Sequence, residues 1–162
     1  KRANSVIKII LCHLNFEVIY KKQMNRKQLT QFLETEFQQV ADDFEIILSQ
    51  SKALQVIMRI SDKHLRPGGT VSGPSMFALA DVAFYLAILE KIGPKALSVT
   101  TSATINFMRK PSNAPLLAIP KIHKLGKQLV VGNVMIYAVS DNHLTSPIAS
   151  ASLTYSIPPV KA

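Results

Sequence analysis

One aspartate stands out because its neighbours in the sequence are almost free of charge. Asp81 lies inside the run MFALADVAFYLAIL, residues 76–89, which is otherwise apolar. Aspartate is a poor residue for the middle of a helix, and a buried carboxylate is costly unless it is paired or hydrogen-bonded. Two interpretations remain open. Asp81 is either satisfied locally at a polar seam, or it is a catalytic carboxylate whose burial tunes its basicity.

A glycine-containing loop precedes this run. The loop HLRPGGTVSGP, residues 64–74, leads into the expected helix, and the free N–H groups of a helix N-terminus suit an anion or a developing oxyanion. Gly73 and Asp81 are eight positions apart, roughly 12 Å along a helix. Within one chain they cannot easily converge on one reacting atom. Two copies packed helix against helix would bring them together, so we expect a composite site at a homodimer interface.

These residues need a helix to hold them, and the sequence marks both of its ends. Gly73-Pro74 favours a helix start and Gly93-Pro94 a stop. Because the helix is apolar all round except at Asp81, we expect it to be enclosed rather than amphipathic. Strands are predicted on both sides of it, over 44–49, 53–60, 97–108, 116–123, 128–139 and 148–157. This order predicts an α+β fold, one long helix wrapped by an antiparallel sheet of five to six strands.

The strand predicted over 97–108 has the clearest alternation. Apolar residues and threonine alternate with polar residues from Leu97 to Phe107, which indicates a strand with one buried face. The turn residues Asp141-Asn142 then predict that 128–139 and 148–157 form an antiparallel hairpin.

Residues 1–23 differ from the rest. Their apolar run is interrupted by Lys8 and lacks a small-residue cleavage site, so it does not resemble a signal peptide, and it is too short and polar to span a bilayer. From Met24 onward, apolar residues recur at helical spacing. We therefore expect 1–23 to be an extension and 24–162 to be a single domain, which truncation to Met24 leaves intact.

The chain of 162 residues has a formal charge of +9. After Asp81 there are eight basic residues and two acidic ones, which favours nucleic acid, anionic lipid or a phosphorylated small molecule as partner, or simply a solvated basic surface. The basic residues lack interleaved aromatic residues and the four histidines are scattered, so we expect no nucleic acid and no metal. The single cysteine, Cys12, makes a reducing cytoplasm the default location.

The segments GGTVSGPSMFALADVAFYLAIL and SVTTSATINFMRKP resemble the hotdog-fold acyl-coenzyme A thioesterases of the phenylacetic-acid degradation type. The resemblance extends from Met24 to about Ile157. It implies hydrolysis of acyl-coenzyme A by a homodimer or a homotetramer, with no cofactor other than the coenzyme A of the substrate and no membrane partner.

The resemblance also implies roles for individual residues. Gly73 would donate its N–H to the thioester carbonyl, and Asp81 of the other subunit would act as nucleophile or general base. Thr100 would help to position the attacking water. The residues that it places near the coenzyme A phosphates are Arg109 and Lys110, with Lys124 or Lys127 in support.

Three positions depart from the family pattern. Ser72 and Pro74 replace a histidine and a glycine, and Arg66 stands where relatives with the fuller apparatus carry an asparagine. Arg66 is a further candidate for binding coenzyme A, and His64 could serve as a substitute acid. These departures leave two hypotheses: a thioesterase, or a non-catalytic acyl-thioester binding or regulatory protein on the same fold.

Overall fold

The computed structural model describes residues 23–49 and 53–158, and the expected extension 1–23 therefore lies almost wholly outside the described residues. The elements are, in chain order, α2 (Arg26–Glu36), α3 (Gln38–Ala41), β1 (Phe44–Leu48), β2 (Leu54–Met58), the short 3-10 helix η1 (Asp62–His64), β3 (Leu65–Arg66), β4 (Thr70–Val71), α4 (Gly73–Ile92), β5 (Val99–Phe107), β6 (Leu116–Leu125), β7 (Leu129–Ala138) and β8 (Ala149–Ser156).

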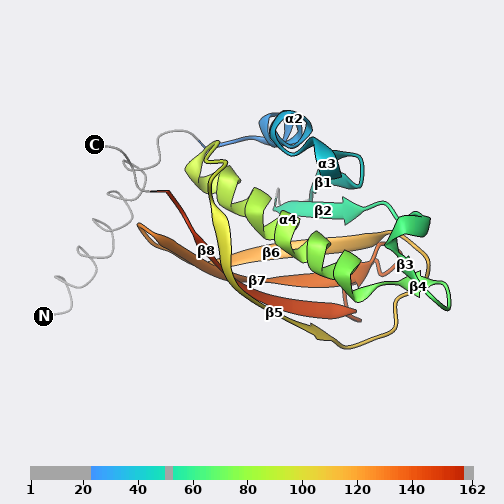
Figure 1. The fold of residues 1–162 in the computed structure, drawn as a ribbon. Coiled ribbons are helices and arrows are strands. Elements are labelled where there is room, and N and C mark those ends of the chain that lie inside the picture. Colours follow the sequence, from blue (N-terminus) through green and yellow to red (C-terminus); the bar gives the residue numbers. More distant parts are fainter. Residues whose placement is uncertain (1–22, 50–52, 159–162) are drawn as a thin grey trace, which may run out of the picture.

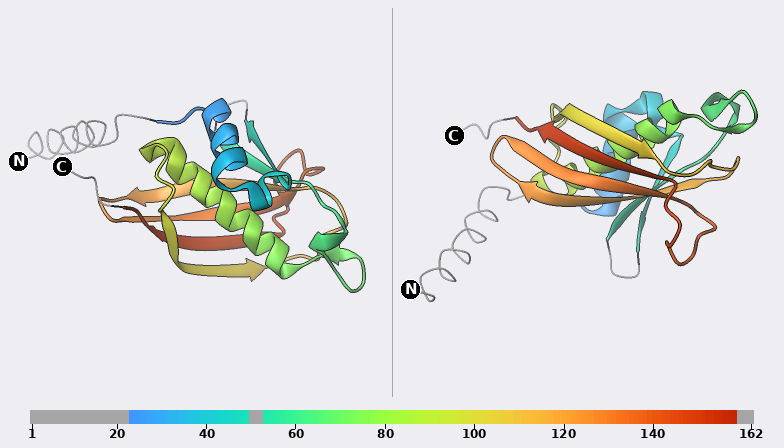
Figure 2. Two further views of the ribbon diagram at one scale, coloured as in Figure 1. Left: turned by 45° about the horizontal axis from the view of Figure 1, so that its top comes forward. Right: turned by 90° about the horizontal axis from the view of Figure 1, so that it is seen from below.

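Six strands form one sheet in the order β1-β2-β6-β7-β8-β5, and every neighbouring pair in it is antiparallel. The long helix α4 lies across one face of this sheet, and α2 lies beside it near β1 and β2 (Figures 1 and 2). The short hairpin of β3 and β4 stands at the N-terminal end of α4. This arrangement confirms the predicted α+β fold, including the strand number and the hairpin of the last two strands.

The ends of α4 follow from local chemistry. Ser72 caps the first turn, because its hydroxyl accepts from the N–H of Ser75, and Pro74 occupies the first turn, where no N–H is needed. Gly93 ends the helix with φ at 83°, a backbone conformation that glycine adopts without strain. The predicted start and stop are both confirmed.

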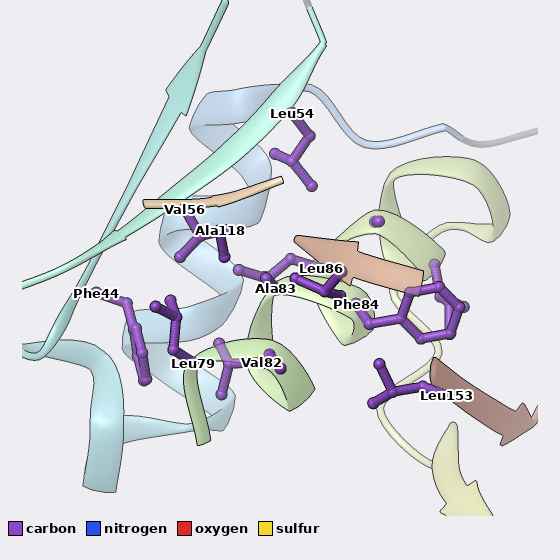
Figure 3. Close-up of a cluster of buried hydrophobic side chains, with 14 of the residues drawn as sticks. Phe44, Leu54, Val56, Leu79, Val82, Ala83, Phe84, Leu86, Ala118 and Leu153 are labelled. Carbon is purple, nitrogen blue, oxygen red and sulfur yellow. The ribbon is translucent and has the colours of Figure 1, made fainter. Parts of the chain in front are cut away.

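The core lies between α4 and the concave face of the sheet (Figure 3). Phe84 of α4 is fully buried, with its ring edge-on to Tyr155 of β8. Gly132 of β7 faces this ring, and a Cβ at that position would collide with the ring and with the main-chain oxygen of Lys121. Glycine is therefore required for the helix to lie so close to the sheet.

The N-terminal helix α2 forms where the spacing of apolar residues predicts it. Leu29, Phe32 and Leu33 are buried, and Asn25 with Gln28 makes a capping box at its start. Met24 is also buried, and its N–H donates to the carbonyl oxygen of Glu90 in α4.

The prediction of a single buried face on the strand 97–108 holds only in part, because Ala103 and Ile105 pack against the core while the other residues do not. A strand does form, but β5 is the edge strand of the sheet, and most of its residues are exposed. Val99 is 54% exposed and Phe107 is 52% exposed, while Leu97, just before the strand, is 78% exposed. The register of β5 with β8 shifts between Thr100 and Ser102, so Val99 lies on the opposite face from Ala103 and Phe107, and the alternation in the sequence does not correspond to one face of the strand.

Candidate active site

Asp81 lies midway along α4 with its side chain partly open to solvent, and it is held by two hydroxyl groups. Thr100 Oγ1 donates to Asp81 Oδ1 over 2.6 Å, and Tyr155 Oη donates to the same oxygen over 2.7 Å. Tyr155 Oη also lies 3.2 Å from the main-chain oxygen of Asp81. The structure therefore brings the predicted residues Asp81 and Thr100 together and adds Tyr155 to them.

Thr100 reaches Asp81 because β5 contains a bulge. The register of β5 with β8 shifts between Thr100 and Ser102, so Thr101 is the extra residue. Without that shift, the alternation would place Thr100 on the face opposite to Ala103. With it, Thr100 lies opposite Tyr155, on the face that α4 covers.

Sequence reasoning did not identify Tyr155. It lies in the predicted strand 148–157 and belongs to the inward-facing set that includes Ala151 and Leu153. A tyrosine in such a set carries a hydroxyl into the core, which is the signal that could have revealed it. Burial, together with the negative charge of Asp81, raises the pKa of Tyr155 far above its usual range, so its hydroxyl stays protonated and remains a donor.

A cavity of about 310 Å³ opens beside Asp81. Its wall combines aromatic rings with polar groups: Glu36, Phe37, Asp81, Val82, Tyr85, Ala96, Ser98, Val99, Thr100 and Tyr155. Burial and the nearby Glu36 raise the pKa of Tyr85 to about 12. The hydroxyl of Ser98 is buried and has no hydrogen-bond partner among the described residues. The wall of the cavity is therefore mixed in character, and it includes two carboxylates, those of Asp81 and Glu36.

A second cavity, of about 670 Å³, lies at the N-terminal end of α4. Gly73, Arg66, Arg109 and Lys110 all line it, so the structure brings these four predicted residues together. The ring of Phe107 packs against Gly73, where an added Cβ would stand 3.3 Å from it. The positive side chains at the N-terminal end of α4 suit an anionic ligand.

The structure separates other predicted residues. Lys127 lies in the turn between β6 and β7, at the end of the sheet where Leu129 pairs with Ser156. Arg109 follows the C-terminal end of β5, where Phe107 pairs with Ala149, so Lys127 and Arg109 lie at opposite ends of the sheet. Gly73 and Asp81 line different cavities within one chain, in agreement with their separation along the helix.

His64 is not a solvated loop residue. It is 6% exposed, its Nδ1 accepts from the N–H of Ser61 over 3.0 Å, and its Nε2 lies 3.4 Å from Asp43 Oδ2. Its carbonyl oxygen accepts from the Ser75 hydroxyl and the Ser72 N–H. These contacts hold the loop against the first turn of α4, which is a structural role.

Within residues 23–49 and 53–158, no three His, Cys, Asp or Glu side chains gather as metal ligands would. The same part of the chain has no helix long and apolar enough to cross a membrane.

Comparison with known proteins places this geometry in a family. Residues 68–144 match the sequence profile of the thioesterase superfamily. A candidate thioesterase from Silicibacter sp. TM1040 is 41% identical, with a TM-score of 0.74, over 84% of this chain and 93% of its own. No curated protein sequence matches the chain significantly.

Two more distant structures share the fold. A hypothetical thioesterase protein from Streptococcus pneumoniae, solved with coenzyme A, is 17% identical over 83% of this chain and 99% of its own, with a TM-score of 0.64. The PaaI protein from the phenylacetic acid degradation operon of E. coli is 21% identical over 80% and 95%, with a TM-score of 0.62. The chain therefore belongs to the thioesterase superfamily, as a thioester hydrolase with the hotdog fold.

Proposed function

We propose that the protein hydrolyses acyl-coenzyme A thioesters to a free acid and coenzyme A, with Asp81 as nucleophile or general base. One observation carries this proposal. A carboxylate in the middle of an apolar helix accepts from two hydroxyl groups at Oδ1, the one oxygen with side-chain donors among the described residues, and it lines a cavity. A carboxylate needed only to tie the helix to the sheet has no reason to face a cavity.

The reaction balances without a cofactor. As general base, Asp81 takes a proton from water while the oxygen of that water attacks the thioester carbon. The negative charge that develops on the carbonyl oxygen is stabilised by the N–H of Gly73. The bond between carbon and sulfur then breaks, and the proton goes to the departing thiolate. As nucleophile, Asp81 would itself attack the carbon and expel the thiolate, and water would then hydrolyse the resulting anhydride and supply the proton that the thiolate takes up.

We propose a homodimer because one chain does not join the two halves of this site. Gly73 and Asp81 line separate cavities, roughly 12 Å apart along α4. The edge strand β5 leaves Val99 and Phe107 exposed, and a free, apolar strand edge is suited to pair with a second chain. A second copy at this edge would supply its Gly73 to Asp81, and a tetramer of two such dimers is compatible with this.

Coenzyme A carries phosphates, and the cavity at the end of α4 has the charge to bind them. Arg66, Arg109 and Lys110 line it. The Streptococcus pneumoniae structure, solved with coenzyme A, supports the same class of ligand. Lys127 lies elsewhere in the chain, and it belongs to this binding site only if the partner subunit contributes it. A cytoplasmic location, expected from the single cysteine, is part of this proposal.

Release of free thiol from a panel of acyl-coenzyme A substrates tests the proposal. We expect the parent protein to release coenzyme A and Asp81→Asn to lose almost all of this activity while still binding substrate. Asp42→Asn, which changes an exposed aspartate that precedes β1 and does not line the cavity beside Asp81, is the matched control. A parent protein that binds acyl-coenzyme A without releasing thiol would favour the non-catalytic binding protein instead.

Single-turnover hydrolysis in ¹⁸O-labelled water detects a nucleophilic Asp81 whose anhydride is hydrolysed at the aspartyl carbon. As general base, Asp81 leaves the label only in the free acid. As nucleophile, it gains the label itself when water attacks the anhydride on the aspartyl side, which mass spectrometry of the peptide detects.

A further inference from the structure

The proposed reaction assigns no task to the hydroxyl of Tyr155, although this group contacts the proposed catalytic carboxylate. Its side chain is fixed in place: Tyr155 is 2% exposed, and its ring centroid lies 5.6 Å from that of Phe84 and 6.3 Å from that of Tyr85. A ring packed in this way cannot turn aside without opening the core. The position of the hydroxyl is therefore set by packing before any substrate arrives.

Both donors to Asp81 meet the same oxygen. Thr100 Oγ1 lies 2.6 Å and Tyr155 Oη 2.7 Å from Oδ1. Among the described residues, no donor reaches Oδ2. The two oxygens of an aspartate are equivalent in free solution, and here they differ, because hydrogen bonds occupy the lone pairs of Oδ1 and stabilise charge on it. Oδ2 keeps its lone pairs available.

We propose that Tyr155 is a positioning residue: with Thr100 it fixes Oδ1 of Asp81, so that Oδ2 is the oxygen that accepts the proton of water or attacks the thioester. This inference rests on the proposed function of Asp81. A catalytic group held in one orientation avoids the loss of rate that a rotating carboxylate would suffer.

The environment of Tyr155 excludes a more direct role. Burial and the charge of Asp81 raise the pKa of its phenol, which makes the hydroxyl a poor proton donor to a departing thiolate. The same shift keeps it protonated, so it cannot act as a base or a nucleophile. Holding the carboxylate is the task that remains.

Tyr155→Phe tests the inference, since it removes the hydroxyl and keeps the ring. We expect kcat to fall about 10- to 100-fold, the range for a lost hydrogen bond to a charged group, while KM changes less than about twofold. Tyr137→Phe is the matched control, because Tyr137 lies on β7 opposite Leu117 and lines neither cavity. Kinetics are measured at low temperature, with circular dichroism to confirm folding.

Thr100 provides a second pair of variants if Tyr155→Phe does not fold. Thr100→Val should lower kcat without raising KM, and Thr100→Ser, which keeps the hydroxyl, should restore most of it. Parent-like kcat in Tyr155→Phe, or in Thr100→Val, overturns the inference. The activity of Asp81→Asn shows whether only the inference about Tyr155 fails or the proposed function fails as well. If Asp81→Asn is inactive and Tyr155→Phe is fully active, only the inference fails; if Asp81→Asn is itself active, both fail.

Discussion

Thr100 and Tyr155 are cross-strand partners on β5 and β8, and their hydroxyls donate to the same carboxylate oxygen of Asp81. Residues paired in this way have side chains on the same face of a sheet, close enough to act together. The sheet thus presents two donors to a single group on the helix that crosses it. This contact explains how the apolar helix tolerates a charge at its centre.

Replacing Asp81 by alanine should separate activity from stability. We expect kcat to fall on the order of 10²–10⁴-fold, because a group used in the transition state is lost. The melting temperature should change little. Tyr155 Oη can still donate to the main-chain oxygen of residue 81, which lies 3.2 Å away, and the hydroxyl of Thr100 can bond to water because Thr100 is exposed. Alanine is also a better helix former than aspartate.

A thermal melt beside a thiol-release assay on the same preparation of Asp81→Ala gives both values. A variant that melts far below the parent yet keeps most of its specific activity would assign Asp81 a structural role instead.

Removing the positive charges at the end of β5 should weaken binding of the nucleotide part of the substrate. Arg109→Ala with Lys110→Ala should raise KM for acyl-coenzyme A, and more so at low salt, where charges are screened least. An acyl-pantetheine substrate, which lacks the nucleotide phosphates, should be almost unaffected. Lys95→Ala, which lies outside this cavity, is the control. Equal losses on both substrates would contradict a phosphate-binding role.

A composite site predicts complementation between two inactive variants. Asp81→Asn and Gly73→Pro, which lacks the donor N–H, should each be inactive as homodimers. When the two chains are co-expressed, random pairing makes about half of the dimers mixed, each with one intact site of two, so about a quarter of the parental activity should return. Thiol release from the co-purified mixture measures this. If no activity returns although mixed dimers form, Asp81 and Gly73 do not meet across the interface.

Gly132 should tolerate no side chain. Alanine at this position would collide with the ring of Phe84 and the main chain at Lys121, and overpacking of this kind costs about 1–3 kcal/mol. The free energy of unfolding from urea denaturation measures the effect. Ser152→Ala, at an exposed position of β8, should stay within about 0.5 kcal/mol of the parent. Parental stability in Gly132→Ala would mean that α4 can move away from the sheet.

Much of the fold is predictable because its signals are local. Gly73-Pro74 and Gly93 bound α4 through the chemistry of helix ends, and alternation marks the strands. Asp81 is conspicuous for the same reason, since a single charge in an apolar run needs no knowledge of its neighbours in space. The family resemblance gave Gly73 a role at the thioester and Arg109 a role at the coenzyme A phosphates, but it did not predict that both line one cavity with Arg66.

The residues alone thus predict the central helix, the carboxylate within it and the six strands of the sheet, but not the short elements α3, η1, β3 and β4. Three features follow from the packing of the whole chain instead: β5 is an edge strand, a bulge at Thr101 turns Thr100 toward Asp81, and Tyr155 is the second donor. Tyr155 is 74 positions from Asp81. Whether two residues so far apart in the sequence meet depends on strand order and register. Both arise from the packing of the whole sheet, and neither can be inferred from the periodic pattern of a single segment.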